Sequence, residues 1–295
     1  MLFSVVIPAY NRSEFLPMTL ATVSGQRFSD FEVIVVNDGS SDKIEAVVGK
    51  CDLPVRLLSQ AHLGPGPARN VGASHARGAY LAFLDSDDCW FPWTLECFAA
   101  LIEQHDSPAL LSGSLRQFSD DAELSALEEE PLQASAFADY LSSDDPAPFV
   151  GACMTVIRRD VFRESGGFVQ RRINCEDHDL VMRVSTARGF VQITAPTTIA
   201  WRQHAVSETR NVQSTIEGNR FLVAQELAGH YPGGPQRAPV RRAIIARHAR
   251  AAALAGLSLG HRRLAWQLYR ETFTWHVQLR RWKFLFGFVL KALVS

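Results

Sequence analysis

Four short apolar runs alternate with helical segments at the start of this chain, and this alternation limits its fold more than any other feature. The runs are Phe3–Pro8, Phe31–Val36, Val55–Leu58 and Ala79–Leu84. The first and the last of these runs are typical of buried strands, and the other two are also predicted to be strands. Helical segments between such strands are typical of crossovers in a parallel sheet. The sequence therefore predicts an α/β fold: a three-layer, Rossmann-like domain with a mostly parallel central sheet.

Polar side chains follow three of these strands, at the point where each strand ends. They belong to Pro8-Ala9-Tyr10-Asn11, Asn37-Asp38-Gly39-Ser40 and Asp85-Ser86-Asp87-Asp88. The carboxyl ends of parallel strands share one edge, where open α/β sheets bind their ligands. Arg69 and Asn70 begin the intervening helix, and a helix N-terminus favours an anion. This edge is predicted to hold a nucleotide, with Asp38 on the base or ribose and Asp87 holding a metal on the phosphates.

The acidic turn Asp85–Asp88 places three carboxylates within four positions. Carboxylates this close repel one another unless a cation, hydrogen-bond donors or water compensate their charge. Mg²⁺ or Mn²⁺ is the natural candidate, because both ions take oxygen ligands and often share them with a diphosphate. A solvated Asp turn is an equally good interpretation of this motif alone.

A second acidic cluster, Glu176-Asp177-His178-Asp179, begins a helix predicted over 174–188. A carboxylate near a metal–diphosphate site can act as the general base that deprotonates an acceptor hydroxyl. Acids are also favoured at a helix N-terminus by the helix dipole, and spacing alone favours this second interpretation.

The charge of the chain is divided unevenly between its two ends. Residues 236–295 contain twelve Lys or Arg and one acid, Glu271, so this segment carries +11 and the first 235 residues carry −12. The C-terminal pattern is helical, with an apolar stripe at helical spacing, and residues 275–282 are either continuous helix or a hinge. The stripe comprises Leu264, Leu268, Trp275, Leu279, Trp282, Phe286, Val289 and Leu293.

Three interpretations of this basic, aromatic segment remain open. It packs on the core or on a second copy of the chain, it lies on an anionic membrane surface, or it binds nucleic acid. The acidic body disfavours nucleic acid, so we expect no such partner and favour membrane contact combined with packing or homodimerisation. The side chains expected to face lipid are Trp275, Trp282, Phe284, Phe286 and Phe288.

The N-terminal sequence and the cysteines predict the compartment. The first eight residues have no basic stretch typical of a signal peptide. The five cysteines are scattered and odd in number, which favours a reduced protein. We therefore expect a cytoplasmic location, with peripheral contact at the inner face of the cell membrane.

In order along residues 2–205, the chain resembles the family 2 glycosyltransferases of the GT-A fold. The segments that carry the resemblance are Ser4–Arg12, Val36–Ser40, Ala68–Gly72, Phe83–Asp88, Gly166–Phe168 and Glu176–Leu180. The resemblance implies inverting transfer of one sugar, a hexosyl group, from a nucleotide sugar to an acceptor hydroxyl. The donor is usually a UDP-sugar, and the acceptor is a glycan or lipid-linked glycan in surface polysaccharide biosynthesis.

The resemblance also implies residue roles. Pro8, Tyr10 and Asn11 would lie near the base and ribose, Asp38 would contact uracil, and Arg69 and Asn70 would shape the diphosphate pocket. Asp85-Ser86-Asp87 is similar to a DXD motif, in which Asp85 and Ser86 would meet the nucleotide sugar and Asp87 would ligate Mg²⁺ or Mn²⁺. His204 resembles a histidine that reaches the metal. Asp177 matches the catalytic base, with Glu176 beside it.

These roles predict how the chain divides into domains. Residues 1–210 would form the glycosyltransferase domain, with a nucleotide-binding half over 1–110 and an acceptor half over 111–210. Residues 211–295 would form a basic helical extension.

An alternative function is a nucleotide-binding scaffold that has lost catalysis, which the presence of both Asp87 and Asp177 disfavours. A nucleotidyltransferase would need a phosphate-binding loop that the segment Pro8–Arg12 does not provide.

Overall fold

The computed structural model describes residues 1–119, 124, 127–143, 150–203 and 211–294. The chain packs as two compact units. The sheet unit comprises Met1–Ser143, Pro148–Arg172 and Ala187–His204, and the helical unit comprises Asp144–Ala147, Ile173–Thr186 and Ala205–Ser295. The helical unit therefore includes a segment before residue 210, and the domain boundary expected there stays a prediction.

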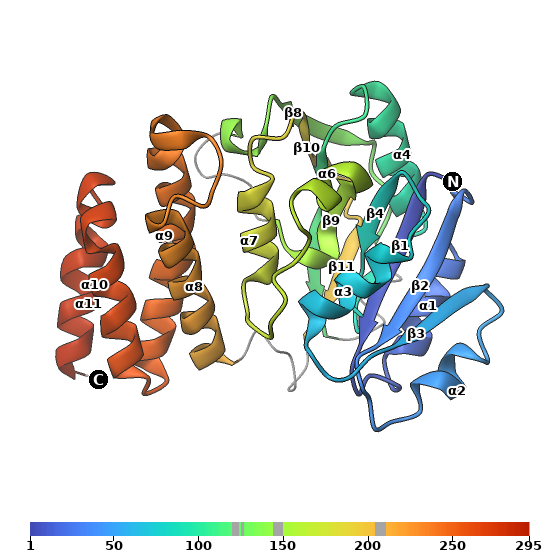
Figure 1. Ribbon diagram of the computed structural model, residues 1–295, viewed down its shortest axis with the longest axis horizontal. Coiled ribbons are helices and arrows are strands. Elements are labelled where there is room, and N and C mark those ends of the chain that lie inside the picture. Colours follow the sequence, from blue (N-terminus) through green and yellow to red (C-terminus); the bar gives the residue numbers. More distant parts are fainter. Residues whose placement is uncertain (120–123, 125–126, 144–149, 204–210, 295) are drawn as a thin grey trace. The chain divides into compact units, whose positions relative to one another are not determined.

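Among the described residues, an eight-stranded sheet has the order β3-β2-β1-β4-β9-β6-β10-β8 (Figure 1). The first four strands in this order are parallel. Strand β9 is antiparallel to β4 and β6, while β10 is parallel to β6 and antiparallel to β8. The strands are β1 (Phe3–Ala9), β2 (Phe31–Asn37), β3 (Val55–Ser59), β4 (Tyr80–Phe83), β6 (Leu110–Ser112), β8 (Gln133–Phe137), β9 (Thr155–Arg158) and β10 (Phe190–Ala195). The predicted α/β fold with a mostly parallel sheet is confirmed.

A smaller sheet contains β5 (Cys89–Trp90), β11 (Ile199–Arg202) and β7 (Leu115–Phe118), in that order. Strand β5 follows the acidic turn directly, and β11 pairs with it in antiparallel register. The acidic turn is therefore held at both ends, by β4 of the large sheet before it and by β5 of the small sheet after it.

Helices cover both faces of the large sheet. Val5 and Ile7 of β1 belong to one apolar core with α1 (Leu16–Ser24) and α4 (Thr94–Gln104). The opposite face packs on α3 (Pro65–Ser74), where a Cβ on Gly72 would lie 2.4 Å from Val6 Cγ1. Only glycine permits this close approach of helix to strand. The described part of the sheet unit also contains α2 (Ile44–Val48), α6 (Arg159–Glu164) and the short 3₁₀ helices η1 (Tyr140–Ser142) and η2 (Ala152–Met154).

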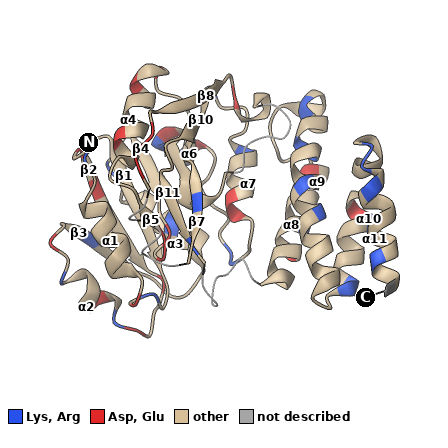
Figure 2. Cartoon of the chain, turned by 180° about the vertical axis from the view of Figure 1, so that it is seen from behind, with Lys and Arg blue, Asp and Glu red and all other residues tan. Residues whose placement is uncertain are grey.

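The helical unit contains α7 (Glu176–Arg183), α8 (Val212–Leu227), α9 (Gly234–Ser258), α10 (Arg262–Gln278) and α11 (Trp282–Val294). Figure 2 shows blue Lys and Arg residues along the C-terminal helices, as the uneven charge of the sequence requires. In the described part of the chain, no helix is both long enough and apolar enough to cross a bilayer.

The predicted apolar stripe is interrupted between α10 and α11. Arg280, at the turn between the two helices, has a left-handed backbone with φ 52°. As a result, Trp275, Phe284 and Phe288 are buried, with 3%, 7% and 0% of their surfaces exposed. The prediction that these three side chains face lipid is wrong, because they form the interior of the helix bundle. The other two, Trp282 and Phe286, are exposed.

Replacing Arg241 by Ala should destabilise the helical unit by about 3–5 kcal/mol. Arg241 Nε donates to Glu226 Oε2 at 2.7 Å, and the two side chains are 4% and 1% exposed. The variant would leave the Glu226 carboxylate buried beside only the partly exposed Arg242. Urea unfolding followed by circular dichroism measures the loss. Arg263→Ala, on the surface of α10, is the matched control and should change stability by less than about 0.5 kcal/mol.

Candidate active site

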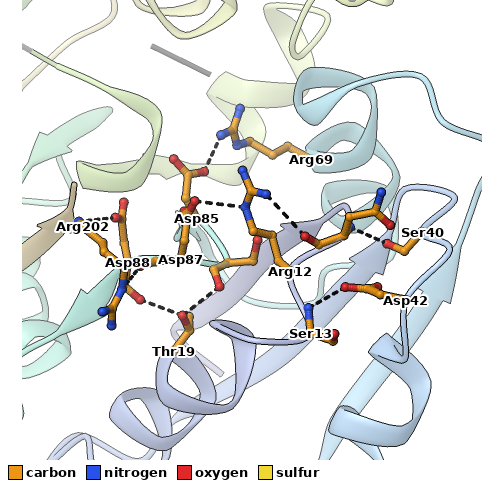
Figure 3. Close-up of polar contacts among 12 residues, drawn as sticks. Arg12, Ser13, Thr19, Ser40, Asp42, Arg69, Asp85, Asp87, Asp88 and Arg202 are labelled. Atoms are coloured by element: carbon orange, nitrogen blue, oxygen red, sulfur yellow. Dashed lines mark hydrogen bonds and ion pairs between the residues drawn. The ribbon is translucent and has the colours of Figure 1, made fainter. Parts of the chain in front are cut away.

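The acidic turn Asp85–Asp88 is held in place from two directions (Figure 3). From β11, the Arg202 backbone N–H donates to Asp88 Oδ1 at 3.0 Å, and Arg202 Nε donates to the Asp87 carbonyl at 3.1 Å. From α1, the Thr19 hydroxyl lies 3.0 Å from the Ser86 carbonyl and 2.8 Å from that of Asp88. Ser86 and Asp88 are buried, so the solvated-turn interpretation does not describe this segment.

Two arginines offset the negative charge of Asp85 and Asp87, the two less buried carboxylates of the turn. Arg69 donates to Asp85 Oδ1 at 2.5 Å, and Arg12 Nε donates to Asp87 Oδ2 at 3.2 Å. Figure 3 shows both guanidinium groups pointing toward the turn, one from α3 and one from the segment after β1. Each pair brings a positive guanidinium group against a negative carboxylate and so offsets its charge. The sequence prediction assigned roles to Arg69, Asp85 and Asp87 but none to Arg12 or Arg202, which lie far from the turn in sequence.

Two carboxylates of the turn, those of Asp85 and Asp88, fit a hard divalent cation, and the predicted ligand Asp87 lies outside their group. Asp85, Asp88 and Cys153 offer ligand atoms that lie within 4.8 Å of one another. Asp88 Oδ2 is buried without a hydrogen-bond partner among the described residues. Burial, together with the charges of Asp85 and Asp87, raises the pKa of the Asp88 carboxyl well above its usual value. Oxygen ligands suit Mg²⁺ and Mn²⁺, whereas the Cys153 sulfur is softer than either ion prefers. The predicted metal ligand His204 lies outside the described residues.

The Asp38 carboxylate organises the loop that follows β3. It is 2% exposed and accepts hydrogen bonds from Gln60 Nε2 at 2.6 Å and from the backbone N–H groups of Leu63 and Gly64, each at 2.9 Å. His62 Nδ1 lies 2.9 Å from Asp38 Oδ2. The structure thus gives this carboxylate a loop-holding role, and its contact with uracil stays a prediction.

Tyr10 and His62 form an aromatic stack beside Asp38. Their ring centroids are 3.6 Å apart and the planes differ by 15°. Arg172 Nη1 lies 3.0 Å from His62 Nε2, and a guanidinium can only donate, so the His62 proton lies on Nδ1 and points to Asp38. Nothing in the sequence distinguished His62, because a lone histidine in a loop carries no motif.

The other predicted nucleotide-site residues have structural contacts of their own. Pro8 is buried in β1. Asn11 Oδ1 accepts from the Ser41 backbone N–H at 2.9 Å, which joins the loops after β1 and β2. Asn70 hydrogen bonds both backbone groups of Phe168, each at 2.8 Å, and so fixes the Gly166–Phe168 turn. The structure therefore brings Asn11, Asp38, Arg69, Asp85 and Asp87 to the carboxyl edge of the sheet.

In the helical unit, Asp177 is joined to the residue that follows it. Its Oδ1 accepts the His178 backbone N–H at 2.7 Å and lies 2.8 Å from His178 Nδ1. Burial alone would lower the pKa of His178, but the charge and hydrogen bond of Asp177 outweigh it and raise the pKa. The neighbouring His248 ring, 4.2 Å away, has a pKa well below its usual value because of burial and the charge of His178. Glu176 is buried.

Comparison with known proteins identifies the family. A sequence profile described as "Glycosyl transferase family 2" matches residues 4–166, more than half of the chain. The chain belongs to glycosyl transferase family 2. The profile ends before Asp177, so this residue is assigned by the motif alone.

Curated relatives support the same membership. This family 2 glycosyltransferase is 34% identical over 206 residues to the amylovoran biosynthesis glycosyltransferase AmsB of Erwinia amylovora, with 66% of this chain and 67% of AmsB covered. It is 27% identical over 225 residues to an uncharacterised glycosyltransferase of Haemophilus influenzae, with 73% and 75% covered.

A solved structure confirms the fold. The crystal structure of residues 1–349 of Staphylococcus aureus TarS in complex with UDP-GlcNAc superposes with a TM-score of 0.73. The alignment covers 88% of this chain and 76% of that one at 21% identity. At this identity the likeness shows the GT-A fold alone.

Proposed function

We propose that this protein transfers a single sugar, with inversion, from a nucleotide sugar to a hydroxyl of a glycan or lipid-linked acceptor in surface polysaccharide biosynthesis. The proposal rests mainly on the acidic turn at the carboxyl edge of the sheet, where Arg12 pairs with Asp87 and Arg69 pairs with Asp85. This edge is where α/β folds bind nucleotides. TarS binds UDP-GlcNAc and AmsB acts in amylovoran biosynthesis, which supports a UDP-sugar donor and a polysaccharide product.

The residues that line this edge would divide the work of donor binding. One face of the Tyr10 ring would stack on the base, because the other face already stacks on His62. Arg12 and Arg69 would meet the diphosphate, because guanidinium groups suit phosphate oxygens. Asp38 and Asn70 would act through the loops that they hold, as their side chains are bonded to backbone groups there.

Asp85, Asp87 and Asp88 would hold the metal, Mg²⁺ or Mn²⁺, which when bound neutralises charge on the leaving diphosphate. Asp177 would accept the proton of the acceptor hydroxyl as that oxygen attacks the anomeric carbon. One displacement inverts this carbon. His178 would hold the Asp177 carboxylate in orientation through its Nδ1 contact. The reaction would take place on the cytoplasmic side of the cell membrane.

A thermal-shift panel of UDP, GDP, dTDP and CMP, each with and without Mn²⁺, tests the proposal. We expect UDP to raise the melting temperature most, and only with the metal, because ligand that binds the folded state stabilises it by mass action. Preference for GDP or dTDP would retain the enzyme class and contradict the UDP donor. Stabilisation by none of the four would contradict nucleotide binding at this site.

A further inference from the structure

Helix α11 presents an apolar face to solvent. Its five residues are Trp282, Phe286, Val289, Leu290 and Leu293, with 49%, 68%, 36%, 65% and 76% of their surfaces exposed. Spacings of four, seven, eight and eleven from the first residue place all five on one side of the helix. We call this set the α11 outer face.

The opposite side of α11 is already packed. Phe284, Leu285, Phe288 and Ala292 are buried, and Phe288 stacks on Tyr269 of α10 with centroids 4.3 Å apart. The Tyr269 hydroxyl donates to the Leu285 carbonyl at 3.1 Å. Helix α11 is therefore anchored without its outer face, and a helix that is apolar on both sides is typical of a buried element. The α11 outer face thus requires a cover that the bundle does not supply.

Charge identifies the kind of cover. Residues 236–295 carry +11, and their one acid, Glu271, is bonded by Arg220 at 2.6–3.0 Å. Arg270, Arg280 and Lys283 are exposed on α10, the turn and α11. A second copy that packed through the same face would bring two strongly basic segments together, and like charges disfavour such a contact. An anionic lipid surface offers an apolar interior below a layer of negative charge.

We propose that the α11 outer face lies on an anionic lipid surface, with its five apolar side chains at the headgroup–acyl boundary and Lys283 and Arg280 among the headgroups. Trp282 suits this boundary because its ring is apolar and its N–H is polar. The helix has 13 residues, about 20 Å in length, which is shorter than the ~30 Å hydrocarbon core. It therefore lies along the surface and does not span it. This inference does not depend on the proposed sugar transfer.

Vesicle sedimentation with the full chain tests the inference. We expect binding to phosphatidylcholine vesicles that contain about one third phosphatidylglycerol, and much weaker binding to pure phosphatidylcholine. Raising the salt to about 0.5 M should weaken binding, because it screens the headgroup charge. The double variant Phe286→Ser and Leu290→Ser should lower the partition coefficient at least ~10-fold, since it removes two inserting side chains.

Leu227→Ser is the matched control. Leu227 ends α8 and is 63% exposed, like the replaced residues, but it lies outside the α11 outer face, so binding should stay unchanged. Failure of the wild-type chain to sediment with anionic vesicles, or equal sedimentation of the double variant, would overturn the inference. So would light scattering that shows a wild-type dimer dissociated by the double variant, because the cover would then be a second copy.

Discussion

Replacing Asp177 by Asn should reduce sugar transfer at least ~100-fold while donor binding stays near the wild-type level. The amide keeps the size of the side chain, and its oxygen can still accept the His178 hydrogen bonds that Asp177 Oδ1 accepts at 2.7 and 2.8 Å. It cannot take up the proton of an attacking hydroxyl. Release of the nucleotide in the presence of acceptor, from sugar donors that carry the nucleotide selected by the panel, measures transfer.

The matched control for this variant is Asp160→Asn. Asp160 also lies in the first turn of a helix, α6, but its side chain is 58% exposed and pairs with Arg158 on the surface. Transfer should stay within about twofold of wild type in this control. Full activity of Asp177→Asn would show that Asp177 is not the general base. Its carboxylate would then serve only as a favourable charge at the N-terminus of α7. A loss of both transfer and nucleotide stabilisation would indicate misfolding and would not support a base.

The strands and the acidic turn could be predicted because their signals are local. The apolar runs of β1, β2 and β4 form strands that are largely buried, so their composition alone identifies them. The edge strand β3 is only partly buried. The acidic turn follows β4 directly and must lie at the carboxyl edge if the neighbouring strands are parallel.

The partners of these residues could not be predicted, because they come from distant parts of the chain. Arg12 reaches Asp87 across 75 positions, and Arg202 reaches Asp88 across 114. The antiparallel insertion of β9 between β4 and β6 is also non-local. Asp38 shows the same limit, because no motif marks the backbone donors after β3 that its carboxylate accepts. Its base contact stays a prediction.

The C-terminal helices show how one turn changes the interpretation of a periodic pattern. A continuous helix would place Trp275 and Trp282 on the same side, because seven residues make nearly two turns. The left-handed Arg280 breaks that relation, so Trp275 is buried in the bundle and Trp282 is exposed. The sequence contains no glycine at this position to signal the break.

Replacing Asp87 by Asn should abolish the Mn²⁺-dependent part of UDP stabilisation and lower transfer at least ~100-fold, because a neutral amide is a weaker ligand for a hard divalent cation. EDTA should lower the UDP stabilisation of the wild-type protein to the level of Asp87→Asn. Excess Mn²⁺ should restore little of the UDP stabilisation of the variant. Direct titration of the protein with Mn²⁺ and UDP, followed by the melting temperature, measures the effect without sugar transfer.

Two further variants separate metal binding from the ion pair that Asp87 forms with Arg12 at 3.2 Å. Arg12→Gln breaks the same ion pair and removes a group proposed to meet the diphosphate, but it keeps the carboxylate. Its UDP stabilisation should therefore be weaker and should still require Mn²⁺. Asp52→Asn removes an exposed acid that precedes β3 and should behave as wild type. If Arg12→Gln lost the Mn²⁺ dependence as completely as Asp87→Asn, the ion pair itself would maintain the site. Asp87 would then be a structural partner of Arg12, because losing either member of the pair would have the same consequence.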